Sequence, residues 1–301
     1  MGNERKKMLL VGDNPFHGIS HLSQERARVR GDAITHAEYA AKLVMTSLEN
    51  GADGFMFSVS ETTLSILRII EERGGSEPLS LYALAPYAYE YVRLANEAGG
   101  APGLAKKFAK QIVFSGNVKA IAMGLKGVVR TDPIALMKAY LTFEISRIKS
   151  SVGKQGNLRS VLLHEIITDM ALALNLGQIF KSHVDFMSKL GIEPGFETRN
   201  FPYLVNKFKE WNIDFHKIVI GTPFNKVGFQ MNPSRTECEK ALLAVQEPNI
   251  IAMSTLAAGY LKLQEAMNYI WSLPNLNGLV IGVSKESHAR ETFKFLRDTF
   301  L

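Results

Sequence analysis

The sequence has 301 residues, of which 46% are hydrophobic and 21% are charged, a composition typical of globular proteins. It holds a single cysteine, Cys238, which excludes a disulfide within the chain. No Cys/His cluster has the spacing of a structural zinc site either. A reducing compartment suits such a sequence, so we expect a cytoplasmic protein.

The N-terminal segment lacks the features of a targeting or anchoring signal. Arg5, Lys6 and Lys7 precede a short apolar run, residues 8–11, and a signal peptide needs a longer one. The formal net charge is +6, but the basic residues are spread along the chain without the interleaved aromatic residues of a nucleic-acid surface. We therefore expect a small-molecule substrate as partner, with no nucleic acid and no membrane, and the sequence leaves the oligomeric state open.

Short apolar runs alternate with longer amphipathic stretches from one end of the chain to the other. The predicted strands cover residues 8–11, 54–58, 79–84, 160–164, 217–221, 249–254 and 278–283, with a weaker candidate at 193–198. The clearest predicted helices cover residues 36–49, 132–148, 201–211, 235–245 and 286–297. Such alternation is typical of βαβ units, which build either a closed barrel or an open doubly wound sheet.

A closed barrel is the better of these two predictions. An open nucleotide-binding sheet usually carries a G-x-G-x-x-G turn after its first strand, whereas residues 12–18 read Gly-Asp-Asn-Pro-Phe-His-Gly. We therefore predict an α/β fold, a single (β/α)8 TIM barrel over residues 1–301. The stretch from about 87 to 130 is irregular or inserted, and its apolar segment 118–123 would be a ninth strand or part of the insertion.

Polar residues follow the predicted strands, and in a barrel the C-terminal ends of the strands carry the site. We call this set the polar rim: Asp13, Asn14, His17, His21, Ser58, Ser60, Glu61, His164, Glu165, Asp169, Glu197, Thr198, Arg199, Asn200, Thr222, Asn225, Lys226, Ser254, Ser284 and Lys285. His164 is the leading candidate because it ends an apolar strand, and an imidazole can move a proton near pH 7. The alternative is a hydrogen-bonded histidine with a structural role at the edge of the core.

Two further groups of rim residues have competing interpretations. Asp13, His17 and His21 could ligate a metal together with Glu197 or His164, although their spacing is not diagnostic and a turn at Asp13 explains part of the pattern. The C-terminal segment from Gly282 joins a strand to a helix, which favours a phosphate site on backbone N–H groups. That site would consist of Gly282, Ser284, Lys285 and Arg290, and the alternative is an ordinary helix capped by Ser284.

The C-terminal half of the chain resembles the aldo-keto reductase superfamily. Residues 280–292 are similar to that family's last strand and helix, and residues 256–259 to its Pro-Leu-x-x-Gly loop. Phe224-Asn225 stands where the family often has Tyr-Asn, and Leu162-Leu163-His164 matches the strand that carries its catalytic histidine. The resemblance covers about half of the chain, and it implies a barrel, oxidoreductase chemistry and NADP, with its phosphate on Ser284, Lys285 and Arg290.

The N-terminal half departs from the family pattern. The family's second strand ends in Asp-Thr-Ala with a catalytic tyrosine soon after, whereas residues 55–61 read Phe-Met-Phe-Ser-Val-Ser-Glu. The catalytic lysine has no clear counterpart, Lys126 being the nearest guess, and the Ser-Asn pair that holds nicotinamide is Glu197-Thr198. Without the tyrosine and lysine the reductase mechanism is lost, so we expect a divergent member of the superfamily and not an ordinary reductase.

Three functional hypotheses follow. The first is an enzyme that acts on a small carbonyl-containing or anionic substrate at the barrel mouth, with His164 as acid/base. The second is a metal-assisted lyase, isomerase or hydrolase that uses Asp13, His17, His164 and Glu197. The third is a non-catalytic descendant that binds a ligand, which the number of ionisable residues on the polar rim argues against.

Overall fold

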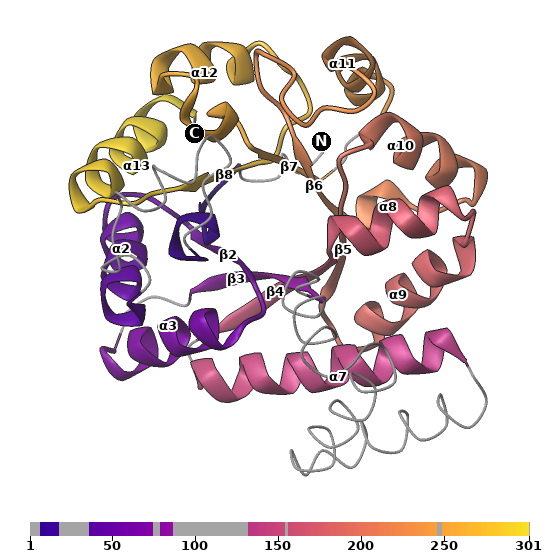
Figure 1. Ribbon diagram of the computed structural model, residues 1–301, viewed down its shortest axis with the longest axis horizontal. Helices are drawn as coiled ribbons and strands as arrows, with labels where there is room; N and C mark the ends of the chain where they lie inside the picture. The colour runs from indigo at the N-terminus through magenta and orange to yellow at the C-terminus, as the bar shows by residue number, and fades with distance from the viewer. Residues whose placement is uncertain are drawn as a thin grey trace, which may run out of the picture.

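The computed structural model describes residues 7–17, 36–74, 79–86, 132–153, 156–245 and 249–300. In this part of the chain each strand pairs in parallel with the next, and the last pairs with the first, so that the sheet closes (Figure 1). The strands are β1 (Met8–Gly12), β2 (Gly54–Ser58), β3 (Ser80–Ala85), β4 (Asn157–Leu163), β5 (Glu193–Glu197), β6 (Val219–Pro223), β7 (Asn249–Met253) and β8 (Gly278–Gly282). The predicted closed (β/α)8 barrel is confirmed.

Helices surround the barrel on its outer face (Figure 1). The described helices are α2 (Ala37–Glu49), α3 (Glu61–Glu72), α7 (Pro133–Val152), α8 (Glu165–Ala173), α9 (Gly177–Lys189), α10 (Phe201–Glu210), α11 (Arg235–Leu243), α12 (Leu263–Trp271) and α13 (Glu286–Phe300). Short 3-10 turns are η1 (Asn14–His17), η3 (Phe215–Lys217) and η4 (Ala257–Gly259). None of the described helices is both long and apolar enough to span a bilayer.

Local side-chain chemistry sets where several helices begin. Asp132 caps α7 by accepting hydrogen bonds from the N–H groups of Ile134 and Ala135, with a proline in the first turn. Ser60 and Thr63 form a capping box at the start of α3. Glu61, a member of the polar rim, therefore points away from the barrel, with its side chain 70% exposed and paired with Arg147.

The apolar core has two layers that follow from the alternation of side chains along each strand. One layer fills the space between the strands and the surrounding helices. The other fills the barrel interior and consists of Leu10, Met56, Tyr82, Leu84, Leu162, Val219, Ile251 and Val280. Leu162, Val219 and Ile251 are each fully buried inside the barrel.

Several predicted boundaries need correction. His164 does not end a strand; β4 stops at Leu163, and His164 caps the following helix because its backbone turns out of the sheet. The strand predicted at residues 217–221 begins two residues later, because Lys217 belongs to a 3-10 turn. The irregular stretch 87–130, Lys126 and His21 lie outside the described residues, so the ninth strand and the single-domain organisation stay predictions.

The buried His183 makes folding sensitive to acid. It is fully buried on α9, and its Nε2 lies 3.1 Å from the carbonyl oxygen of Val161. Burial lowers the pKa of His183 to about 4 from an ordinary value of 6.5. The unfolded chain therefore binds the proton more tightly than the folded chain, and stability falls as the pH drops from about 6.5 through about 4.

We predict that His183→Gln, which cannot titrate, removes this loss. Relative to wild type, the variant should gain about 3 kcal/mol in free energy of unfolding between pH 7 and pH 4, measured by urea denaturation. His216→Gln, at an exposed histidine, is the matched control for the replacement of histidine by glutamine. If the free energy of unfolding changes with pH in the same way in wild type and in His183→Gln, the account is contradicted.

Candidate active site

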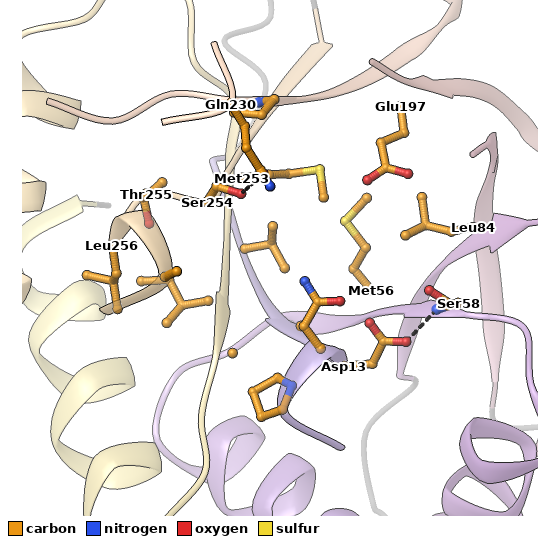
Figure 2. Close-up of a pocket in the computed structure, with 18 of the residues that line it drawn as sticks. Asp13, Met56, Ser58, Leu84, Glu197, Gln230, Met253, Ser254, Thr255 and Leu256 are labelled. Atoms are coloured by element: carbon orange, nitrogen blue, oxygen red, sulfur yellow. Dashed lines mark hydrogen bonds between the residues drawn. The ribbon is translucent and has the colours of Figure 1, made fainter. Parts of the chain in front are cut away.

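A cavity of about 760 Å³ lies at the C-terminal ends of the strands (Figure 2). Every strand except β4 contributes to its wall, and His164, the residue after β4, lines it as well. Its polar lining residues are Asp13, Asn14, Ser58, His164, Glu165, Glu197, Arg199, Gln230, Ser254, Thr255, Ser284 and His288. The structure thus brings much of the polar rim into one place. All four residues predicted to be catalytic lie at this end of the barrel: Asp13, His164 and Glu197 line the cavity, and His17 contacts Asp13.

Asp13 follows β1 and reaches across to the neighbouring strand. Its Oδ2 accepts a hydrogen bond of 2.6 Å from the backbone N–H of Ser58, and the same oxygen lies 3.0 Å from His17 Nε2. The side chain is buried, with only 4% of the residue exposed. The Asp13 side chain, which follows β1, therefore lies against the end of β2.

Glu197 ends β5 and points into the cavity, toward Met56 and Leu84 (Figure 2). Its Oε2 accepts a hydrogen bond of 3.1 Å from the backbone N–H of Glu165, at the first turn of α8. Burial raises the pKa of Glu197 to about 7, and the nearby carboxylates Asp13 and Asp169 add to this rise. The carboxyl group can therefore exchange a proton at neutral pH.

Helix α8 holds the chain that follows Glu197. Asp169 accepts hydrogen bonds from the hydroxyl of Thr198, at 2.5 Å, and from the backbone N–H of Arg199, at 3.2 Å. Arg199 in turn donates from Nε to Glu165. Burial, followed by the charge of Glu197, raises the pKa of Glu165, and Arg199 opposes this rise. The result is a network that fixes the direction of the Glu197 side chain.

His164 lies at the start of α8 with its ring held by the backbone. Its Nδ1 accepts a hydrogen bond of 3.3 Å from the N–H of Ile166, so in the neutral ring the proton is on Nε2. Burial lowers the pKa of His164, which keeps the imidazole neutral at pH 7. A neutral imidazole in this tautomer is a hydrogen-bond donor through Nε2.

The floor of the cavity is apolar and belongs to the barrel interior. Met56, Leu84, Met253 and Val280 are members of both the interior core and the lining. Gly221 leaves room for the two thioethers, because a Cβ there would lie 3.0 Å from the sulfur of Met253 and 3.3 Å from the methyl of Met56. The polar groups of the lining therefore lie next to an apolar floor.

The predicted phosphate site is only partly assembled. Gly282 and Ser284 line the cavity, but Lys285 and Arg290 do not. Arg290 is exposed and lies 4.0 Å from Glu286, one turn earlier on the same helix. The helix begins at Glu286, so Ser284 is not its cap. These four residues do not form one phosphate site at the cavity, and NADP stays a prediction.

The metal hypothesis also stays a prediction. Among the described residues, no three His, Cys, Asp or Glu side chains are grouped so as to hold a metal ion. His21, one of the proposed ligands, lies outside them. Asn225, a member of the polar rim, does not line the cavity. Its side chain instead makes two hydrogen bonds with the backbone of Phe229 in the same loop, at 2.7 and 2.8 Å.

Some lining residues were missed by the sequence analysis. Gln230 and His288 reach the cavity from a loop and from a helix, where the rule of strand ends gave no signal. Ser254 was included in the polar rim, and its hydroxyl lies 3.2 Å from Gln230 Oε1. Gln230 and Ser254 both have positive φ angles, 62° and 51°, an uncommon backbone conformation often found at functional sites.

No family model matches the sequence, and no curated protein matches it. Two solved structures, both described as a "putative aldo-keto reductase" from Pseudomonas aeruginosa, share its fold. The first is 11% identical, covers 97% of this chain and 90% of that chain, and has a TM-score of 0.58. The second is 11% identical, covers 97% and 91%, and has a TM-score of 0.57. The aldo-keto reductase-like barrel is confirmed; at this identity the likeness shows the fold alone.

The hydrogen bonds of Asp13 give a prediction about stability. Asp13→Ala leaves the buried N–H of Ser58 without its acceptor, which should lower the free energy of unfolding by about 1–3 kcal/mol. Asp13→Asn keeps an acceptor oxygen, so it should lower the free energy of unfolding clearly less than Asp13→Ala. Urea denaturation at pH 7 measures both; an alanine variant as stable as wild type would show that the side chain does not join the two strands.

Proposed function

We propose that the chain is an enzyme that transfers a proton to and from a carbon next to a carbonyl group of a small substrate, with Glu197 as the acid/base. The observation that carries this proposal is the Glu197 carboxyl, which is buried, faces the cavity, and has a pKa raised to about 7. General acid/base groups work best with a pKa near the working pH. The barrel fold provides such a site at its C-terminal mouth.

Glu197 performs the proton transfer in this proposal. As the carboxylate, it takes a proton from the substrate carbon, and the electron pair of the C–H bond moves to form an enolate on the carbonyl oxygen. Glu197 then returns the proton to the same or a neighbouring position. Its other oxygen stays on the N–H of Glu165, so the carboxyl keeps its direction through the cycle.

His164 stabilises the developing charge on the substrate oxygen. Its Nδ1 accepts from the backbone N–H of Ile166, which places the proton of the neutral ring on Nε2. A neutral donor fixed in place is suited to an enolate oxygen. This role differs from the acid/base role expected from the sequence, because burial lowers the pKa of His164 and so favours the neutral ring.

The raised pKa of Glu197 predicts a stability effect that needs no substrate. The folded chain holds the Glu197 proton more tightly than the unfolded chain, so stability falls as the pH rises from about 4.5 through about 7. Glu197→Gln cannot ionise and its amide oxygen can still accept from Glu165. As the pH rises from 5 to 8, the free energy of unfolding of the variant should increase by about 2–3 kcal/mol relative to that of wild type.

The matched control is Glu193→Gln, at the opposite end of the same strand, where the carboxylate is partly exposed and pairs with Arg159. Urea denaturation of the three proteins at the two pH values measures the effect. With a substrate in hand, Glu197→Gln should also slow exchange of the carbon-bound hydrogen with D₂O by about 10²–10⁴, and the control should not. Exchange at the wild-type rate in Glu197→Gln would overturn the proposed function.

A further inference from the structure

Arg199 lines the cavity, and only one end of its guanidinium is in use within the described part of the chain. Its Nε donates to Glu165, whereas Nη1 and Nη2 donate to no described residue. A guanidinium stays charged in proteins, and it has donors but no acceptor. A partner for these two nitrogens therefore has to be a group that accepts hydrogen bonds.

The chain around Arg199 fixes where the guanidinium lies. The backbone N–H of Arg199 donates to Asp169 at 3.2 Å, and its carbonyl oxygen accepts from the backbone N–H of Asn232 at 3.0 Å. The side chain is 30% exposed and is held by its ion pair with Glu165. Because the arginine is held in this way before a ligand arrives, binding to it costs little additional side-chain ordering.

The remaining edge of the guanidinium suits an anion. The planar group can pair with one carboxylate at its Nε side and, through two parallel hydrogen bonds from Nη1 and Nη2, with a second carboxylate or a phosphate. Glu165 takes the first position. Arg199 also opposes the rise in the pKa of both Glu165 and Glu197, so its charge acts on the Glu197 carboxyl. A small ligand held on this edge therefore has the rest of its chain near Glu197.

We propose that Nη1 and Nη2 of Arg199 bind an anionic oxygen group of the substrate, a carboxylate or a phosphate, and so place its carbon chain beside Glu197. This inference rests on the proposed function for the carbonyl part of the substrate. It puts the anion site at the end of β5, whereas the sequence predicted one in the segment from Gly282 to Arg290.

Three probes with a three-carbon carbonyl skeleton test the inference. Pyruvate carries a carboxylate, pyruvamide replaces it with a neutral amide, and dihydroxyacetone phosphate carries a phosphate. Binding is followed at pH 7 by NMR on methyl-labelled methionine, because Met56 and Met253 belong to the cavity floor. Their signals are assigned by their loss in Met56→Leu and Met253→Leu.

The better of the two anions should bind at least about tenfold more tightly than pyruvamide, because charge-assisted hydrogen bonds are about twice as strong as neutral ones. The tighter anion identifies the group as a carboxylate or a phosphate. Arg199→Gln should weaken that anion by about tenfold or more and leave pyruvamide within about threefold of its wild-type affinity. Arg199→Lys keeps the charge without the two parallel hydrogen bonds and should retain part of the preference.

Two further variants locate the effect. Arg159→Gln removes an arginine that pairs with Glu193 and does not line the cavity, so it should leave all affinities unchanged. His288→Gln tests the histidine that lines the cavity from α13, and the preference for the anion should persist in it. If Arg199→Gln is poorly folded, Arg199→Lys and the order of affinities in wild type decide.

Three results would overturn the inference. In the first, pyruvamide binds wild type as tightly as both anions do. In the second, no probe shifts the Met56 and Met253 signals. In the third, the preference for the anion is lost in His288→Gln and kept in Arg199→Gln.

Exchange of carbon-bound hydrogen with D₂O separates this inference from the proposed function. If the anion binds tightly through Arg199 but the protein accelerates exchange in none of the three probes, the anion site stands and the proposed function fails. If pyruvamide exchanges as fast as pyruvate and binds as tightly, the proposed function stands and the anion site fails.

Discussion

The N-terminal turn of α8 holds the end of β5, and the candidate site depends on this contact. Glu165 provides its backbone N–H to Glu197 and its carboxylate to Arg199, while Asp169 accepts from Thr198 and from the Arg199 backbone. These hydrogen bonds connect two consecutive βα units of the barrel. They leave Glu197 one direction in which to point, which is into the cavity.

Burial and charge compete at Glu197, and their balance gives the site its chemistry. Removal from water favours the neutral acid, while the Glu165 N–H and Arg199 favour the carboxylate. Burial is the larger effect, so the pKa rises to about 7 and both protonation states are present at neutral pH. The cost is a folded state that is less stable in alkali than it would be with an amide at this position.

The sequence predicted the barrel well because its signals were repetitive. Short apolar strands such as residues 54–58 recur between amphipathic helices, and parallel strands buried on both faces have few other arrangements. The rule that sites lie at strand ends then places Asp13, His164 and Glu197 together. The sequence narrows the cap of α7 to Thr131 or Asp132, because capping depends on adjacent residues, and the structure shows that it is Asp132.

What the sequence did not predict are contacts between residues far apart in the chain. Asp13 accepts from Ser58, 45 positions later, and that pairing depends on the register of β1 against β2. The roles proposed for His164 and Glu197 depend on such contacts as well. A histidine at a strand end looks like a base, but its Nδ1 is committed to the backbone of α8, and the burial that raises the pKa of Glu197 comes from the assembled barrel.

The account depends most directly on the protonation of one carboxyl group. Carbon-13 NMR of the protein labelled at the glutamate side-chain carboxyls, with the Glu197 signal assigned by its loss in Glu197→Gln, measures this group alone. The account predicts a titration midpoint near pH 7 for that signal. A midpoint near 4.5, the ordinary value for glutamate, would contradict it.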